Sequence, residues 1–454
     1  MSAIRPAAVA GTFYPAEPAE LRRTLAGLFA ALPADAGMPA PKALIVPHAG
    51  YVYSGAVAAR AYACLAGLRG RIRRVVLLGP AHRVYVRGLA LPEAERFATP
   101  LGEVTLDLPG MRALSALPQV TVNAAAHRFE HSLEVQLPFL QQALGEFSLL
   151  PLAVGDATGA ETAEVLEAAW GGDETLIVIS SDLSHFHGDA EARRLDGRTV
   201  AAILALEPHL SHEQACGATP VNGLILAARR HGLHPVALDV RNSGAASGDL
   251  DRVVGYAAFA FVPEAAAGRA ERDRGETLLA LARGEIAGRL GWPAVTPAPA
   301  DWLRRPGASF VTLTCAGELR GCVGSLTAHR PLGEDVRENA VAAAFRDPRF
   351  APLTRAEFEH VRVEVSELSP SEPIVAANEA EALARLRPHV DGVVFECGHH
   401  RSTFLPQVWE HLPEPAAFLA QLKRKAGLTA DFWSDAVRLS RYTVSKWKES
   451  EPAA

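Results

Sequence analysis

The first 262 residues alternate short apolar runs with longer segments of helical periodicity, and this alternation restricts the fold more than any other feature. The apolar runs are bounded by Gly, Pro, Asp or Asn, which is typical of buried strands. Strands that alternate with helices form a mainly parallel or mixed sheet with helices on both faces. We therefore predict an α/β domain over residues 1–262. The predicted strands are 43–46, 74–78, 147–154, 175–179, 235–240 and 253–261, and the predicted helices are 18–31, 54–65, 132–144, 190–205 and 221–230.

The composition changes after this domain. The residues that follow are mostly Ala, Glu and Arg without apolar anchors, which suits either an interdomain linker or the solvated start of a helix. Beyond them the patterns mix a helix with strands, so we predict a smaller α+β domain. The linker is placed at 263–275 and the second domain at 276–454, with a helix at 276–290 and strands at 310–314 and 361–365.

The overall composition is that of a globular protein, because 49% of the 454 residues are hydrophobic and 21% are charged. The net charge of −6 argues against a chain whose main role is to neutralise nucleic acid phosphates. No apolar run approaches the roughly 18 to 20 residues of a membrane span, and the N-terminus lacks a signal-peptide pattern. The five cysteines form no C-x-x-C pair, so neither a disulfide framework nor a zinc ribbon is indicated. We expect a soluble, cytoplasmic protein.

Polar residues follow four of the predicted strands at their carboxyl ends, where ligands bind in open α/β sheets. His48 and His82 follow two of these strands, and two imidazoles with one carboxylate form the facial triad of non-haem Fe(II) enzymes. We predict that both are metal ligands; the alternative for each is a hydrogen bond to backbone. Asp182 and His185 follow another strand and are candidates for the carboxylate and for a catalytic acid or base. Asp182 could equally cap the next helix.

A second metal motif competes with this interpretation. The run from His127 to His131 fits the H-x-x-E-H signature of inverzincin metallopeptidases, with Glu207 downstream as a third ligand. That motif needs both histidines on one helical turn, whereas Ser132 is the predicted N-cap of the next helix, which would leave His127 before it. We therefore disfavour a zinc peptidase. His131 and Glu134 are expected either to line a polar pocket or to pack as hydrogen-bonded structural residues.

In the second half the distinctive segment is 319–324, Leu-Arg-Gly-Cys-Val-Gly, which predicts a turn. Arg320 could hold an anionic group, or it could be a surface arginine of a hairpin in which Cys322 is a packed thiol. Cys322 has no adjacent His or Lys in the sequence, so nothing indicates that it is a nucleophile.

Several of these motifs occur together, and in the same order, in the Memo family, which the chain resembles over about residues 4–262. The resemblance implies the fold of class III extradiol dioxygenases, with His48 and His82 holding a divalent metal, Fe(II). It also implies a ligand pocket that includes Phe13, Tyr51 and Thr219, and His131, Asp182 and His185 as catalytic groups. The shared motifs are Gly-Thr-Phe-Tyr-Pro at 11–15, Pro-His-Ala-Gly-Tyr at 47–51, Gly-Pro-Ala-His at 79–82, Glu-His-Ser-Leu-Glu at 130–134, Ser-Asp-Leu-Ser-His at 181–185 and Val-Gly-Tyr-Ala at 254–257.

The chain departs from the pattern of this family at two places. Animal members have a cysteine ligand near the Asn-Ser-Gly segment and prokaryotic members often have Asp there, whereas this chain has Ala245 and Ala246. Thr219 stands where the dioxygenase base would be, and Thr takes no proton near neutral pH. The resemblance therefore leaves three outcomes, in which the third ligand is Asp182, is Asp249, or is missing.

The second half resembles the AMMECR family over about residues 275–447, through segments 319–324, 342–350, 365–368 and 404–408. The resemblance implies ligand binding at Arg320 and Cys322, and an RNA-modification role has been suggested for the family. The basic residues near the C-terminus could contact phosphates or could form a solvated helix face.

A chain with both halves resembles the AmmeMemoRadiSam system, which implies a radical S-adenosylmethionine protein as partner. This chain has no C-x-x-x-C-x-x-C motif, so the iron–sulfur cluster would belong to that partner. Two hypotheses follow. In the first, the chain is a dioxygenase-like metalloenzyme that acts on a small-molecule or nucleotide-derived substrate. In the second, it is a binding module that keeps the fold without turnover, and stoichiometric metal would separate the two.

Overall fold

The computed structural model describes residues 4–32, 38–293, 297–376 and 378–449. The chain divides into two compact units, Met1–Ala270 and Glu271–Ala454. Helix α10 (Glu264–Arg289) occupies the segment for which a linker or the start of a helix was expected. Residues 1–3, where the predicted N-terminal domain begins, and residues 450–454, where the predicted C-terminal domain ends, lie outside the described residues.

The N-terminal unit is built on one mixed sheet with the strand order β1-β5-β6-β8-β3-β9-β2-β12-β10, to which β11, β4 and β7 add at the side. Strands β8, β3, β9 and β2 are parallel, and β12 is antiparallel to β2. The strands are β1 (Ile4–Arg5), β2 (Ala43–Val46), β3 (Arg74–Pro80), β4 (Leu89–Leu91), β5 (Arg96–Thr99), β6 (Gly102–Leu106), β7 (Val120–Val122), β8 (Ser148–Val154), β9 (Thr175–Ser180), β10 (His185–His187), β11 (Leu233–Asn242) and β12 (Val253–Pro263).

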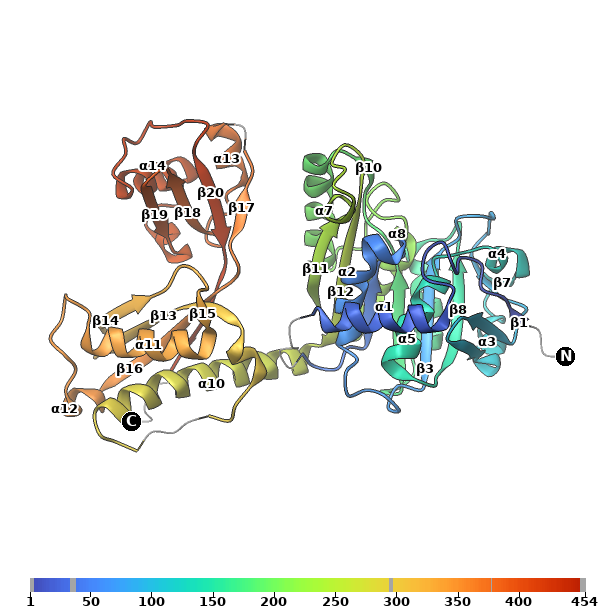
Figure 1. Ribbon diagram of the computed structural model, residues 1–454, viewed down its shortest axis with the longest axis horizontal. Helices are drawn as coiled ribbons and strands as arrows, with labels where there is room; N and C mark the ends of the chain where they lie inside the picture. The colour runs from blue at the N-terminus through green and yellow to red at the C-terminus, as the bar shows by residue number, and fades with distance from the viewer. Residues whose placement is uncertain (1–3, 33–37, 294–296, 377, 450–454) are drawn as a thin grey trace. The chain divides into compact units, whose positions relative to one another are not determined.

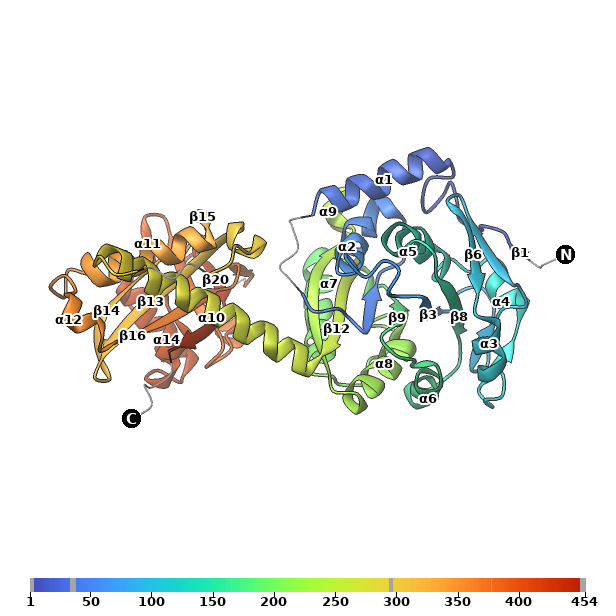
Figure 2. The ribbon, with the colours of Figure 1, turned by 90° about the horizontal axis from the view of Figure 1, so that it is seen from below.

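Helices cover both faces of this sheet (Figure 2), which is why its central strands are continuous apolar runs. Helices α1, α2 and α5 lie over one face and α6 and α8 over the other (Figure 2). The mainly parallel α/β fold predicted from the sequence is therefore confirmed. The helices of this unit are α1 (Pro18–Ala30), α2 (Tyr51–Ala63), α3 (Leu108–Leu114), α4 (Ala124–Arg128), the 3-10 turn η1 (Glu134–Gln136), α5 (Leu137–Leu144), α6 (Gly159–Ala169), α7 (Asp189–Leu204), α8 (Ala218–Arg230) and α9 (Gly244–Ser247).

Two predicted helix starts are wrong. Helix α2 begins at Tyr51, and Ser54 lies inside it, where its hydroxyl donates to the Ala49 carbonyl at 2.9 Å. Ser132 caps no helix, because its hydroxyl donates to the carbonyl of Pro80 at the end of β3. The chain turns through η1 first, and α5 starts only at Leu137.

The C-terminal unit contains two antiparallel sheets with helices, as the predicted α+β class requires (Figure 1). The first sheet comprises β13 (Pro306–Cys315), β14 (Glu318–Gly324), β15 (Arg330–Pro331), β16 (Val361–Leu368) and β21 (Val444–Lys448). The second comprises β17 (Glu372–Ile374), β18 (Gly392–Cys397), β19 (His400–Phe404) and β20 (Arg438–Tyr442). Besides α10, the helical segments are η2 (Asp301–Arg304), α11 (Leu332–Phe345), α12 (Arg355–Phe358), α13 (Glu379–Arg385), η3 (Pro406–Glu410) and α14 (Pro415–Lys425).

The turn predicted at 319–324 is wrong, because these residues belong to strand β14, which pairs with β13. The turn lies just before it, at Ala316 and Gly317, which have φ values of 50° and 85°. Two successive residues with positive φ match the right-handed twist of a hairpin, so the reversal occurs there.

Among the described helices, none is both long enough and apolar enough to cross a membrane.

Candidate metal centre

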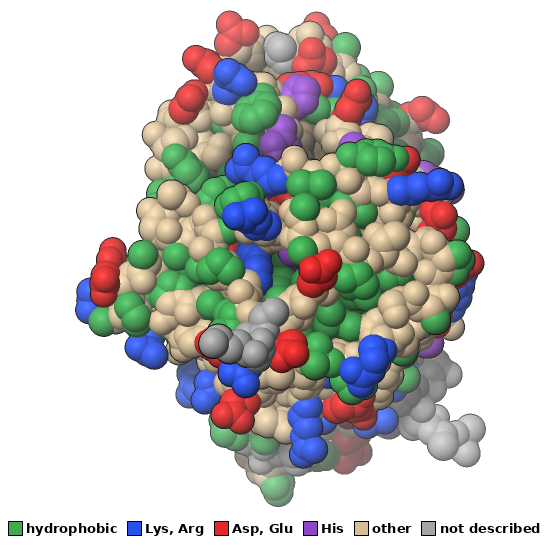
Figure 3. Space-filling model, turned by 90° about the vertical axis from the view of Figure 1, so that its right-hand side faces the viewer, with side chains coloured by type: hydrophobic (Ala, Val, Ile, Leu, Met, Phe, Trp, Pro, Cys, Tyr) green, Lys and Arg blue, Asp and Glu red, His purple; other side chains and the backbone are tan. Residues whose placement is uncertain are grey.

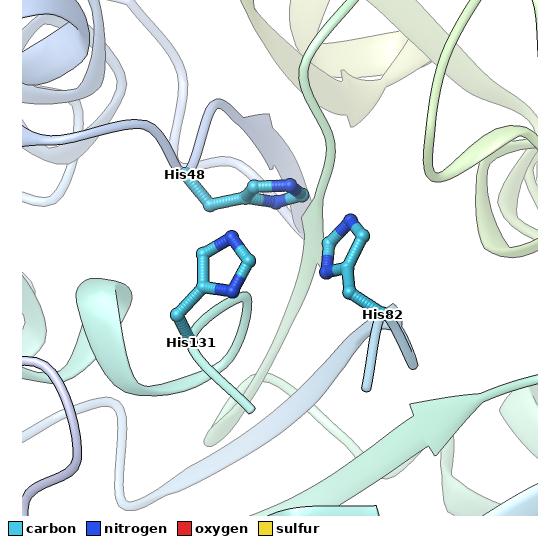
Figure 4. Close-up of side chains that lie close together, drawn as sticks. All are labelled: His48, His82 and His131. Atoms are coloured by element: carbon cyan, nitrogen blue, oxygen red, sulfur yellow. The ribbon is translucent and has the colours of Figure 1, made fainter. Parts of the chain in front are cut away.

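Three histidines converge at the carboxyl edge of the central sheet (Figure 4). His48 follows β2, His82 follows β3, and His131 lies in the loop after α4. Each offers one ring nitrogen, and the three nitrogens lie within 4.8 Å of one another. Strands β2 and β3 are both parallel to β9, so their carboxyl ends reach the same edge and bring the first two rings together.

The ring of His48 is buried and held from behind by a chain of hydrogen bonds. Its Nδ1 lies 2.9 Å from the Ser180 hydroxyl. That hydroxyl donates to the Ser132 carbonyl at 2.6 Å and accepts from the Gln136 amide at 2.8 Å. Gln136 is itself oriented by Tyr62, whose hydroxyl donates to its amide oxygen at 2.8 Å. Because the only hydrogen of Ser180 is already used, His48 must donate from Nδ1. Its Nε2, which lies 3.3 Å from the Cys216 sulfur, therefore carries the lone pair that a metal would take.

His82 is oriented by Glu130. Its Nδ1 lies 2.9 Å from one carboxylate oxygen, and its backbone N–H donates to the other at 2.6 Å. Burial by itself would raise the pKa of Glu130, yet hydrogen bonds from His82 and from the Ser132 amide lower that pKa to about 2. A carboxylate that accepts from the far nitrogen of a histidine is the usual support of a metal-bound imidazole.

His131 completes the cluster. Its ring stacks on His82 with centroids 4.7 Å apart, and Phe13 packs against it at the same centroid distance. Burial lowers the pKa of His131 to about 4, and burial likewise lowers the pKa of His48 well below its ordinary value. Both rings are therefore neutral near pH 7, which is the form that binds a metal.

Asp182 and His185 lie next to the cluster but outside it. Asp182 is buried, and its carboxylate accepts the backbone N–H of His48 at 2.7 Å, so it fixes the loop that carries this histidine. Burial raises its pKa to about 7. The Nδ1 of His185 bonds to the Leu183 carbonyl at 2.8 Å, which leaves its Nε2 as an acceptor, and burial lowers its pKa.

The third histidine changes the expected ligand set. The sequence suggested that Asp182 or Asp249 would complete a site of two histidines and one carboxylate, or that the third ligand was missing. Asp182 binds backbone instead, and Asp249 is exposed and accepts the Asp251 N–H. His131, predicted as a catalytic or packing residue, supplies the third nitrogen. Three neutral imidazoles suit Zn, Cu, Fe or Ni, so the residues present fit a divalent transition metal.

The other predicted pocket residues divide into two groups. Phe13 contacts His131 and so borders the cluster. Tyr51 is buried and its hydroxyl donates to the Val135 carbonyl at 2.8 Å, which is a structural contact. Thr219 lies on the first turn of α8 and its hydroxyl is 3.2 Å from the Nε2 of His212. Ala245 and Ala246 lie exposed on α9.

The inverzincin motif does not form. Helix α4 ends at Arg128, so His127 lies on it whereas Glu130 and His131 lie in the following loop. The Nε2 of His127 bonds to the Ala90 carbonyl at 2.8 Å, and burial lowers the pKa of this histidine to about 4. His127 is thus the structural histidine of the motif, and His131 is the candidate ligand.

In the C-terminal unit, Arg320 and Cys322 lie on β14 and bind their own neighbours. Arg320 pairs with Glu357 through Nε at 3.1 Å, and its Nη2 donates to the Ala351 carbonyl at 2.9 Å. The Cys322 N–H donates to Asp347 at 2.9 Å, and its sulfur accepts from Thr312 at 3.3 Å. Among the described residues, Cys322 is not part of a group of three or more metal-ligating side chains.

Sequence reasoning missed the supporting residues of the cluster. Glu130 was noted only within the peptidase motif and the Memo-family motif at 130–134, and Ser180 and Gln136 were not singled out. One signal for Ser180 was present, since it stands at the end of a predicted strand beside Asp182. No local signal identifies Gln136, because its role depends on contacts with residues far away in the chain.

Comparison with known proteins agrees with this architecture. Residues 5–260 match the model of the Memo-like protein family, and residues 279–447 match the AMMECR1 family. A MEMO1 family protein of Aquifex aeolicus is 35% identical over 278 residues, covering 57% of this chain and 99% of that protein. A MEMO1 family protein of Sulfolobus acidocaldarius is 33% identical over 282 residues, with the same two coverages.

Among solved structures, the crystal structure of the uncharacterized protein PH0010 from Pyrococcus horikoshii is 32% identical. The match covers 39% of this chain and 92% of the Pyrococcus horikoshii chain, with a TM-score of 0.36. The family matches extend over most of both units, and the curated relatives are covered almost from end to end. The chain therefore belongs to the Memo-like protein family, and an AMMECR1 domain follows its Memo-like domain.

Proposed function

We propose that the N-terminal unit is a metal-dependent enzyme of the dioxygenase-like class, with a divalent transition metal held by His48, His82 and His131. One observation carries the proposal. Three ring nitrogens face one another within 4.8 Å, while Ser180 and Glu130 hold the far nitrogens of two of the rings. A histidine that serves only packing does not need this orientation, whereas a ligand does.

The residues beside the cluster can handle a proton. His185 has a free Nε2, and its lowered pKa keeps it neutral near pH 7, so it can accept a proton from a substrate hydroxyl. Asp182 positions the His48 loop through the backbone N–H. When bound, the metal would supply Lewis-acid polarisation or oxygen activation. Phe13 beside His131 gives the site an apolar wall for an organic substrate.

The finer assignments rest on the resemblance stated above and belong to the same proposal. They are Fe(II) as the metal, a small-molecule or nucleotide-derived substrate, a radical S-adenosylmethionine protein as partner, and a cytoplasmic location. The AMMECR1 domain is linked to the Memo-like domain in one chain, which gives the two a fixed ratio and a high effective concentration. That arrangement suits two domains that act in one pathway.

A second candidate is a binding module without turnover, and one observation favours it. Large aromatic side chains close in sequence to His48, His82, His131 and His185 are exposed: Tyr53 on α2 is 47% exposed, Tyr85 76%, Phe129 60%, and Phe186 on β10 62%. Exposed aromatic residues gathered around one site are typical of a binding surface.

Hydrophobic and charged side chains of both signs are interspersed on the face of the molecule in Figure 3, so that face shows no extended basic patch.

The deciding experiment is the metal content of the full chain, purified without oxygen and measured by elemental analysis. The test variant carries both His48→Ala and His82→Ala. The control variant carries His209→Ala and His234→Ala, which replace two exposed histidines. We expect about one metal ion per chain in the wild type and the control variant and none in the first variant. If the wild type contains no metal even after Fe(II) loading, the enzyme hypothesis is overturned and the binding-module hypothesis remains.

A further inference from the structure

A hydroxyl and an imidazole form a pair at the start of helix α8, outside the histidine cluster. The Oγ1 atom of Thr219 lies 3.2 Å from the Nε2 atom of His212. The Nδ1 atom of His212 lies 3.2 Å from the carbonyl oxygen of Cys216. The proposed metal site uses neither of the two side chains, and no sequence motif singled out His212.

The hydrogen bond between the two side chains has a definite direction. A carbonyl oxygen can only accept, so the Nδ1 atom of His212 carries a hydrogen and donates it to Cys216. In the neutral ring the other nitrogen, Nε2, then has a lone pair and accepts from the Thr219 hydroxyl. The hydroxyl hydrogen therefore points at a base, and a third group fixes the orientation of that base. This is the arrangement of an activated nucleophile.

A backbone N–H beside this hydroxyl is unengaged. Thr219 is the second residue of α8, a helix of 13 residues whose N-terminus no side chain caps. The Gly217 N–H donates to the Ser181 hydroxyl, and the Ala218 N–H donates to the Ala215 carbonyl. The Thr219 N–H, in contrast, has no hydrogen-bond partner among the described residues. At the positive end of a helix dipole, this N–H can bind negative charge that develops on a substrate oxygen.

We propose that Thr219 and His212 form a nucleophile and general-base pair that attacks a short-chain acyl ester. The Oγ1 of Thr219 bonds to the acyl carbon, and its proton moves to the Nε2 of His212. The bond to the leaving oxygen breaks, that oxygen takes the proton from His212, and water then releases the acyl group from Thr219. Because Thr219 is only 7% exposed, the acyl group is restricted to a short chain. The pair needs no metal, so this activity is additional to that of the proposed metal site.

4-Nitrophenyl acetate is the probe that tests this, because it carries a short acyl group and releases a coloured product. The full chain is incubated with the probe, once as purified and once after a chelator has removed metal, and mass spectrometry of its peptides locates the acetyl group. The variants are Thr219→Val, Thr219→Ser, which keeps the hydroxyl, and His212→Gln. The matched control is His209→Gln, which replaces another exposed histidine.

We expect acetylation at position 219 in the wild type, in Thr219→Ser and in His209→Gln, with and without metal. Thr219→Val should lose it, and His212→Gln should lower its rate at least about 100-fold. Acetylation of the wild type at other side chains only overturns the nucleophile, and an unchanged rate in His212→Gln overturns the base. A rate that falls when metal is removed overturns an activity separate from the metal site. None of these results depends on the metal content that tests the proposed function.

Discussion

The histidine cluster of the N-terminal unit and the Arg320 and Cys322 segment of the C-terminal unit both carry reactive side chains at a strand, yet they differ in which atoms are engaged. In the cluster, Ser180 and Glu130 bind the outer nitrogens of His48 and His82, and the inner nitrogens face one another. In the segment, the Nε and Nη2 atoms of Arg320 and the N–H of Cys322 bind neighbouring protein groups.

The comparison shows that residue type alone does not identify a ligand site. A ligand site is identified by donor atoms that have no protein partner and that point toward one another. Arg349 shows the same internal pairing as Arg320, since it binds Asp347 at 2.7 Å and the Cys322 carbonyl at 3.2 Å. Arg320, Cys322, Asp347 and Arg349, called the C-terminal cluster below, thus stabilise their own segment of the chain. The N-terminal cluster is held ready for a ligand by groups that are themselves buried.

The largest expected effect concerns a buried ion pair of the N-terminal unit, Arg5 with Glu134. Glu134 is fully buried and accepts from Arg5, from the Ala8 and Val9 amides and from the Tyr14 hydroxyl. Glu134→Ala leaves the Arg5 charge buried without its partner, so we expect the free energy of unfolding to fall by about 3–5 kcal/mol. Urea unfolding of the full chain measures it.

The control for this variant is Glu103→Ala, which breaks the exposed pair with Arg96. We expect it to change the free energy of unfolding by less than about 1 kcal/mol. Equal effects of the two variants would show that the buried contacts of Glu134 contribute no more to stability than an exposed ion pair does.

The next effect is a dependence of stability on pH that comes from Asp182. Burial raises its pKa from 3.8 to about 7 in the folded protein. Between these values the folded state holds a proton that the unfolded state has lost, so stability falls as pH rises, by about 1.4 kcal/mol per pH unit. Asp182→Asn keeps the acceptor for His48 and should remove this slope. Unfolding curves of both proteins at several pH values test it, and parallel slopes would contradict the assignment.

A smaller effect is expected for metal affinity when the support of His82 is changed. Glu130→Gln keeps an oxygen near Nδ1 but removes the negative charge, and loss of such a partner lowers metal affinity by roughly 10–100-fold. Competition with a chelator of known affinity measures the change. Asp156→Asn, an exposed carboxylate that binds Tyr85, is the control and should leave affinity unchanged. Equal affinities of Glu130→Gln and wild type would show that His82 needs no charged partner.

The smallest effect is expected in the C-terminal cluster. Arg349→Gln removes the charged partner of the buried Asp347 but leaves it the N–H groups of Cys322 and Arg349, so we expect the free energy of unfolding to fall by about 1 kcal/mol and metal content to stay unchanged. Thermal unfolding and elemental analysis of the full chain check both. A loss of bound metal in this variant would break the contrast between the two clusters.

The sequence identified the central strands correctly because parallel strands buried on both faces must be continuous apolar runs, as β2 and β9 are. The same reasoning located His48 and His82, since each directly follows such a strand. It could not identify His131 as the third member of the cluster. This residue lies after a short helix, in a loop whose path depends on the Glu130 contacts. In the second sheet of the C-terminal unit, β17, β19 and β20 were missed because these short strands are partly exposed.

The three histidines are distant in the chain, since 34 positions separate His48 from His82 and 49 separate His82 from His131. An unfolded chain would have to close both loops to gather them, so a metal ion would bind the native state in preference to the denatured one. A free ion at one hundred times its dissociation constant would then add about 2.7 kcal/mol to the stability of the unit that contains the cluster. Metal supply would thus set how much of this protein survives unfolding and proteolysis, independently of any reaction that it catalyses.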